Sequence, residues 1–218
     1  MSPRHHPSDE TLLRYAAGTL QTGPALVVAS HIWGCPDCQK LVRRFEAVGG
    51  ALLDELPPTP LDADALARAM ASIESADEPA LPPEHGSPLP AGLEGIHLPA
   101  PLSACTFDSW RWLGPGMRAS RVKLPGNRDS GVMMLRVGPG RALPDHGHTG
   151  TEWTQILHGS FSDAFGRYGP GDLAEVDEDV EHQPIVDAGG ECFCLAAIDG
   201  KMRLRGLLGW LAQPFVRF

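Results

Sequence analysis

The sequence predicts an α+β protein of two domains, a small all-α domain followed by an all-β barrel or jelly roll. Residues 79–101 of the 218-residue chain hold seven of its 21 prolines. This stretch predicts an extended linker, because proline fixes φ and lacks a backbone N–H. Apolar residues recur at helical spacing before it, and short β-rich segments with 17 of the 25 glycines follow residue 101. We therefore expect domains at residues 1–78 and 102–218.

The first two helices of the N-terminal domain are predicted from an N-cap residue and from a Gly-Pro pair that separates them. Ser8 or Asp9 can cap a helix whose apolar face runs from Leu12 to Leu20. Gly23-Pro24 then separates this helix from a second, apolar helix over residues 25–33, which ends at Gly34.

Two further helices complete the predicted domain. The third starts near Pro36, a favourable first-turn position, and Gly49-Gly50 is expected to end or kink it. The fourth covers about residues 62–75, with Leu66, Met70 and Ile73 on one stripe. Four short helices enclose only a small core, so this domain would gain stability from a metal staple.

The C-terminal half has the pattern of short strands divided by Gly, Pro or Asp turns. Such a rhythm is typical of an antiparallel barrel or jelly roll. The predicted strands lie near residues 110–112, 120–124, 132–137, 154–157 and 192–196.

Charge and hydropathy exclude several classes of protein. The 27 acidic and 18 basic residues give a formal charge of −9, the wrong sign for a sequence-independent nucleic-acid binder. The acidity is concentrated in residues 1–98, where 13 acidic residues face six basic ones for a net charge of −7. Strongly apolar runs such as residues 25–29 are far too short to cross a membrane. No signal peptide is visible, so we expect a cytoplasmic protein.

A compact cluster of histidine and cysteine predicts a zinc site in the helical domain. Cys35 and Cys38 have the two-residue spacing of thiolates that share an ion, and His31 lies one helical turn before Cys35. The fourth ligand of a tetrahedral site would be His6 or His5. Two imidazoles and two thiolates neutralise Zn²⁺, so such a structural site can be buried. The alternatives are a redox-active cysteine pair and two unliganded thiols.

The chain resembles a known family at these residues. His6 followed by His31-xxx-Cys35-xx-Cys38 on short helices is similar to the zinc-binding anti-sigma domain, and the whole chain resembles the ChrR-type anti-sigma factors. The resemblance implies that these four residues bind zinc and that the helical domain binds a group IV (ECF) sigma factor. It also implies a C-terminal cupin domain that releases the sigma factor under oxidative stress, with singlet oxygen as a candidate signal.

A second motif predicts a metal site in the barrel. Residues 140–159 fit the first cupin motif, G-x5-H-x-H-x3-E-x6-G, at every fixed position. His146 and His148 are two residues apart, so both side chains face the same side of an extended strand. Glu152 follows a short turn and can return to the same ion.

His182 is the predicted fourth ligand, although the second cupin motif is degraded around it. Pro170-Gly171 and His182 remain, but the usual proline and asparagine are missing. Three imidazoles and one carboxylate suit Zn²⁺, Fe²⁺, Mn²⁺ or Ni²⁺, and the resemblance favours zinc. The alternative is a metal-free barrel with packed histidines. His158 is expected to face outward.

The favoured function is therefore a cytoplasmic anti-sigma factor with a sensing cupin domain that could also bind a small molecule. The alternative is a cupin metalloenzyme, a dioxygenase, isomerase or hydrolase, with a helical docking domain. DNA binding by the helices is disfavoured because phosphate contacts need local Lys or Arg. Cys192 and Cys194 alternate on a β pattern and are expected to be buried packing residues, with a redox role as the other interpretation.

Overall fold

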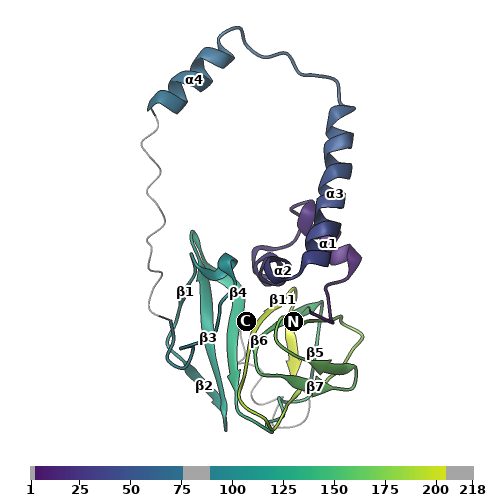
Figure 1. The fold of residues 1–218 in the computed structure, drawn as a ribbon, viewed down its shortest axis with the longest axis vertical. Coiled ribbons are helices and arrows are strands. Elements are labelled where there is room, and N and C mark those ends of the chain that lie inside the picture. The colour runs from purple at the N-terminus through teal and green to yellow at the C-terminus, as the bar shows by residue number, and fades with distance from the viewer. Residues whose placement is uncertain (1–2, 76–88, 205–218) are drawn as a thin grey trace.

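The computed structural model describes residues 3–75 and 89–204, and it has the predicted α+β class. Helices come first in the chain and a β barrel follows (Figure 1). The helices are α1 (Asp9–Ala16), α2 (Thr22–Gly34), α3 (Pro36–Asp54), α4 (Ala65–Ser75) and the short 3₁₀ helix η1 (Ala100–Leu102). The strands are β1 (Thr106–Phe107), β2 (Arg111–Gly114), β3 (Met117–Leu124), β4 (Asn127–Val137), β5 (His146–His148), β6 (Glu152–His158), β7 (Phe161–Asp163), β8 (Gly166–Tyr168), β9 (Leu173–Val176), β10 (Ile185–Val186), β11 (Cys192–Ile198) and β12 (Met202–Leu204).

The helix boundaries differ from the expected ones at the first junction. Ser8 caps α1 as expected, because its Oγ accepts the Thr11 N–H at 3.2 Å. The helix ends at Ala16, so Leu20 lies outside it. The α2 helix already begins at Thr22, which places Gly23-Pro24 in its first turn rather than before it. Proline is tolerated there because the first-turn N–H groups have no partner within the helix.

The third and fourth helices also depart from expectation. The α3 helix begins at Pro36 and continues through Gly49-Gly50 to Asp54, although glycine in a helix costs about 1 kcal/mol relative to alanine. The α4 helix has no buried residue, so it is not part of the small helical core. In Figure 1 it stands away from the other helices and from the barrel. No helix among the described residues is both long and apolar enough to cross a bilayer.

The barrel consists of one large antiparallel sheet and two smaller ones. The large sheet has the strand order β1-β3-β4-β11-β6-β9, with β2 added beside β3. A three-stranded sheet, β10-β7-β8, and the pair β12-β5 close the other side. One core fills the space inside the barrel, and a second lies between the large sheet and the helices. The interior core includes Leu135, Ile156, Phe161, Tyr168, Val186, Cys192 and Cys194.

The outer face of the large sheet is covered by α2 (Figure 1). All seven residues of β11 are buried, so this strand is apolar on both faces. Cys194 belongs to the core inside the barrel, whereas its neighbour Leu195 belongs to the core under the helices. Val27 and Val28 of α2 are completely buried in that second core. The α2 helix therefore lies directly on the barrel, an arrangement that the sequence did not predict.

The second half of the predicted linker, residues 89–101, packs against the rest of the protein. Leu93 is buried, and the Trp110 Nε1–H donates to the Ala91 carbonyl oxygen at 2.8 Å. The rings of Trp33 and His97 lie 5.5 Å apart, which joins this stretch to α2. Residues 76–88, which hold the other part of the predicted linker, lie outside the described residues.

Candidate metal centres

The first candidate centre joins three elements of the helical half. His31 lies in the last turn of α2, Cys35 is the N-cap residue of α3, and Cys38 lies in the first turn of α3. His6 comes from the segment before α1. The four ligand atoms lie within 4.8 Å of one another. The structure thus brings together the four residues that the resemblance selected.

The spacing of these atoms fits a tetrahedron around one ion. The His6 Nδ1 lies 3.3 Å from Cys35 Sγ and 3.5 Å from Cys38 Sγ, and Cys38 Sγ lies 3.4 Å from His31 Nε2. A tetrahedral zinc site with bonds of about 2.0–2.3 Å has edges of about 3.3–3.8 Å. The residues present therefore fit Zn²⁺ in both chemistry and separation.

His6, rather than His5, reaches this cluster. The His5 ring lies 4.3 Å from the ring of Tyr168 on β8, and its backbone carbonyl accepts the Leu173 N–H at 3.1 Å. Asp172 accepts the Arg4 and His5 N–H groups at 2.6 and 3.1 Å. These contacts bind the N-terminal segment to the barrel and direct successive side chains to opposite sides.

The barrel also orients His31. Its Nδ1 lies 2.9 Å from the Gly171 carbonyl oxygen, which can only accept, so Nδ1 carries the proton. The Nε2 lone pair is then free to face the cysteines, as in metal sites where an outer partner fixes the histidine tautomer. Burial lowers the pKa of His31 to about 4 despite this hydrogen bond, and nearby His6 contributes to the fall. The ring is therefore neutral near pH 7, the form that binds a metal.

Cys38 is a protonated thiol when no cation is near. Burial, followed by the hydrogen bond and charge of Cys35, raises its pKa to about 12. Buried thiols of this kind become thiolates when a metal displaces the proton.

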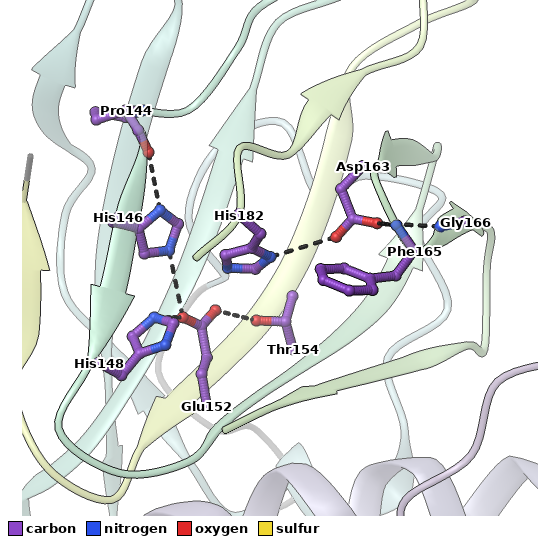
Figure 2. A network of polar contacts seen from close by, with 9 residues as sticks. All are labelled: Pro144, His146, His148, Glu152, Thr154, Asp163, Phe165, Gly166 and His182. Atoms are coloured by element: carbon purple, nitrogen blue, oxygen red, sulfur yellow. Dashed lines mark hydrogen bonds and ion pairs between the residues drawn. The ribbon is translucent and has the colours of Figure 1, made fainter. Parts of the chain in front are cut away.

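The second candidate centre lies inside the barrel (Figure 2). His146 and His148 come from β5 and Glu152 from the first position of β6. His182 is brought beside them because its backbone pairs with that of His146 through two hydrogen bonds of 3.2 and 3.3 Å. All four residues are buried, and their ligand atoms lie within 4.8 Å of one another. The structure thus brings together all four residues of the predicted cupin site.

The polar atoms in this cluster are short of hydrogen-bond partners. Both ring nitrogens of His148, the Glu152 Oε2 and the His182 Nε2 are buried without one. Glu152 Oε2 nevertheless lies 2.5 Å from His148 Nε2 and 3.5 Å from His146 Nε2. Buried polar atoms are rarely left unpaired, and convergence without hydrogen-bond geometry is typical of metal ligands. The donor set suits a divalent transition metal.

Glu152 is held as a carboxylate. Burial opposes its ionisation, but His146 and His148 beside it hold the pKa of this carboxyl well below its usual range. Its other oxygen accepts the Thr154 hydroxyl at 2.6 Å, which fixes the orientation of the group.

Three partners of the cupin ligands were not predicted from the sequence. They are the Pro144 carbonyl oxygen, 2.8 Å from His146 Nδ1, the Thr154 hydroxyl, and the Asp163 carboxylate, 3.3 Å from His182 Nδ1 (Figure 2). Thr154 and Pro144 are close in sequence to the ligands that they contact. In the sequence, Asp163 is an aspartate that precedes a turn with glycine, and this pattern does not predict a contact with His182.

A small cavity adjoins the cupin centre. Its volume is about 30 Å³, and its wall combines Glu152, Thr154 and His182 with apolar side chains. This volume accommodates about one or two water molecules, whereas pockets for organic ligands measure about 300–1,000 Å³. The apolar part of the wall consists of Leu135, Val137, Leu143, Phe161, Pro184, Val186, Cys192 and Cys194.

The two cysteines in this wall are packing residues in the structure. Both are buried, and the hydrogen bond between the Cys194 thiol and Cys192, together with burial, raises the pKa of Cys194 well above its usual value. A thiol with such a pKa is a poor nucleophile at neutral pH. His158 is exposed at the end of β6, as expected, and is not near either centre.

Known proteins resemble this chain in sequence and in fold. A family model described as the ChrR cupin-like domain matches residues 103–199. Over 222 residues the chain is 38% identical to the Anti-sigma-E factor ChrR of Cereibacter sphaeroides, and the match covers 100% of both proteins. The chain belongs to the ChrR family. A solved structure of this family, Rhodobacter sphaeroides SigE in complex with the anti-sigma ChrR, matches with a TM-score of 0.68 and 36% identity. That match covers 91% of this chain and 100% of the solved ChrR-family chain.

Proposed function

We propose that this protein is a cytoplasmic anti-sigma factor that sequesters a group IV (ECF) sigma factor and releases it under oxidative stress. The main support is the full-length similarity to an anti-sigma-E factor and to a chain that was solved bound to SigE. The helical half would bind the sigma factor, and the barrel would respond to the signal.

An exposed apolar surface on the helical half supports a protein partner. We call it the apolar stripe. Its side chains are 50–75% exposed although they are large and apolar. Large apolar side chains gathered on an exposed helix surface commonly mark an interaction site, because burying them is favourable. The stripe has two separate parts, one with Val48, Leu52 and Leu53 of α3 and Leu56 just after it, and one with Leu66, Met70 and Ile73 of α4.

Charge supports the same partner. Residues 1–98 carry a net charge of −7, from six basic and 13 acidic residues. A sigma factor presents basic surfaces to DNA, and opposite charge steers association and favours correct docking.

We propose a structural role for the first centre, with Zn²⁺ held by His6, His31, Cys35 and Cys38. The ion would join α2, α3 and the segment before α1, and two thiolates would neutralise its charge. The tetrahedral spacing of the ligand atoms supports this assignment.

We propose that the cupin centre, with His146, His148, Glu152 and His182 around Zn²⁺ or another divalent transition metal, receives the signal. A metal here would supply a Lewis-acidic position inside an apolar chamber. The cavity of about 30 Å³ admits only a very small ligand, which favours a small oxidant such as singlet oxygen over a metabolite. Release then requires a difference in sigma affinity between two states of the barrel, and a hundredfold loss corresponds to about 2.7 kcal/mol.

The cavity also bears on the alternative of a cupin metalloenzyme. An organic substrate needs a pocket roughly ten times larger than this one. We therefore propose that the barrel senses a signal and does not turn over a substrate.

The decisive experiment measures sigma binding by variants of the apolar stripe. Leu66→Asp with Met70→Asp should weaken the complex with SigE by at least about a hundredfold, since each substitution removes about 1.5 kcal/mol or more of apolar burial and adds a charge. Ala71→Asp, on the other face of α4, is the matched control and should change affinity little. Calorimetric titration provides the measurement. Equal affinity of the double variant and the control would contradict the proposed interface.

A further inference from the structure

A buried carboxylate lies behind the cupin centre. The Asp163 side chain is fully buried at the end of β7, and its Oδ2 lies 3.3 Å from His182 Nδ1. Since Nδ1 must donate to this oxygen, the other nitrogen, Nε2, faces the cluster with its lone pair. Figure 2 shows the His182 ring between the carboxylate and the remaining ligands.

Asp163 also completes the charge balance of the centre. Three neutral imidazoles, one Glu152 carboxylate and a divalent cation leave a charge of +1 in a buried place. The Asp163 carboxylate contacts the ligand His182 rather than the ion itself, and its negative charge cancels this excess. Such outer partners orient a ligand and raise its basicity, and their loss commonly costs about 10–100-fold in metal affinity.

The second oxygen of Asp163 holds the turn between β7 and β8. Its Oδ1 accepts the Phe165 and Gly166 N–H groups at 2.9 and 3.1 Å. This turn lies against the helical half, because a Cβ placed on Gly166 would be 3.4 Å from the His5 ring. His5 also packs against Tyr168 at the other end of β8.

His5 is the direct neighbour of a ligand in the first centre. A series of contacts therefore leads from His182 to Asp163, and from the β7–β8 turn to His5, which is followed by His6. The first steps are the hydrogen bonds of Asp163 and the packing of His5 on β8, and the last step is the peptide link between His5 and His6, whose Nδ1 faces Cys35.

We propose that Asp163 is the positioning residue that orients His182 toward the cupin metal and ties the state of that centre to the N-terminal segment. The inference rests on the proposed metal assignment of the barrel. One oxygen of Asp163 accepts a hydrogen bond from His182, and the other accepts hydrogen bonds from the β7–β8 turn. A change in the position of His182 therefore shifts the turn against which His5 packs.

The first test measures metal affinity in the full chain. Asp163→Asn keeps the size of the side chain and removes its charge. Competition of Co²⁺ with a chromophoric chelator should show a 10–100-fold loss at the cupin centre. The first centre, identified by its thiolate-to-cobalt absorption, should be unchanged. Asp187→Asn is the matched control, because Asp187 binds Ser160, Ser162 and Arg167 in the same small sheet but not His182.

A double-mutant cycle separates positioning from a general effect on folding. In a His182→Ala background, Asp163→Asn should change Co²⁺ affinity by less than about twofold, because the carboxylate acts through the missing ring. An equal loss in both backgrounds would overturn the inference. Failure of the wild-type barrel to bind metal would overturn the metal assignment as well, whereas normal wild-type binding with unaffected Asp163→Asn affinity would overturn this inference alone.

The second test measures the link to the N-terminal segment by hydrogen exchange. With both centres loaded, the amides of Arg4 and His5 should exchange more slowly in the wild type than in His148→Ala, which loses a cupin ligand. In Asp163→Asn saturated with metal, this metal-dependent protection should be lost, while Asp187→Asn should retain it. Full protection in Asp163→Asn would overturn the link between the two centres.

Discussion

At the residue scale, the adjacent histidines His5 and His6 have different roles although their side chains are identical. Their backbone is fixed to the barrel through Asp172 and Leu173. This attachment turns His6 toward Cys35 and Cys38 and turns His5 toward Tyr168. The pair therefore allows a comparison between a candidate ligand and a packing residue of identical chemistry.

We predict that His6→Ala removes one equivalent of zinc per chain and that His5→Ala retains it. The wild type should contain two equivalents of metal, one in each centre. Metal analysis of the purified full chain after dialysis measures both values. If His5→Ala lost the zinc and His6→Ala kept it, His5 would be the ligand and His6 the packing residue.

Asp172 provides a pH-dependent contribution to docking of the N-terminal segment. Burial opposes ionisation of Asp172, but the N–H groups of Gly169, Arg4 and His5 outweigh it and hold the pKa of this carboxyl below its ordinary value. A carboxyl with a lowered folded-state pKa stabilises the fold fully above its unfolded pKa. That contribution is lost as the pH falls through the folded pKa.

Asp172→Asn should therefore lower the free energy of unfolding by about 1–2 kcal/mol at pH 7. The difference from the wild type should narrow below about pH 4, where the carboxyl of the unfolded wild-type chain begins to take up a proton. Urea unfolding at several pH values provides the measurement. A difference that stays constant down to pH 2 would show that the charge of Asp172 is not responsible.

At the element scale, α2 is the helix that joins the two halves. It contacts β4, β6 and β11 of the large sheet, and Val27 and Val28 are completely buried in this interface. The first turn of the helix approaches the sheet very closely. A Cβ on Gly23 would lie 2.2 Å from the Ser130 carbonyl oxygen, a backbone atom that cannot rotate away.

Gly23→Ala should push α2 away from the sheet and destabilise the protein by about 2–4 kcal/mol, as overpacking does when backbone must move. Gly49→Ala is the matched control, since a Cβ there meets nothing within 4 Å and alanine favours a helix by about 1 kcal/mol. Thermal unfolding of both variants provides the comparison. Equal stability of Gly23→Ala and the wild type would show that α2 does not depend on this close approach.

At the scale of the whole molecule, the two halves share a core and a hydrogen-bond network. Glu175 of β9 accepts the Ser8 N–H at 2.8 Å and the Ser8 and Thr11 hydroxyls at 2.8 Å each, so the barrel caps the start of α1. His31 binds the Gly171 carbonyl oxygen just before the same strand. A metal in the first centre would therefore not be the sole connection that holds the first three helices in place.

Chelation of the full chain should lower the thermal midpoint but leave α2 folded on the sheet. A metal at a hundredfold higher concentration than its Kd stabilises the folded state by about 2.7 kcal/mol. Loss of this stabilisation lowers the thermal midpoint by about 5–11 °C in a chain of this length. Circular dichroism at 25 °C should retain most of the helical signal. Complete loss of that signal on chelation would show that the metal alone holds the helical half together.

The sequence was sufficient for the elements and for most of each cluster. His31, Cys35 and Cys38 lie within eight residues around the junction of α2 and α3, and His146, His148 and Glu152 lie within seven residues around the turn between β5 and β6. Local backbone geometry therefore brings the side chains of each group together wherever the segment lies in the fold. The same local rules predicted the helices and the main strands, with errors at boundaries such as Leu20 and Gly23, at Gly49-Gly50, which α3 passes through, and in the assignment of α4 to the helical core.

By itself, then, the sequence determined the α+β class, the order of its elements and the short-range ligand groups. Tertiary structure decided the choice of His6 over His5, the contact of Asp163 with His182, and the place of α2 on the large sheet. The contacts behind His6 and α2 join residues more than a hundred positions apart, and Asp163 at the end of β7 meets His182 in the segment just before β10. Side-chain periodicity carries no information about which distant surface will cover an apolar face, so only the folded chain could supply these contacts.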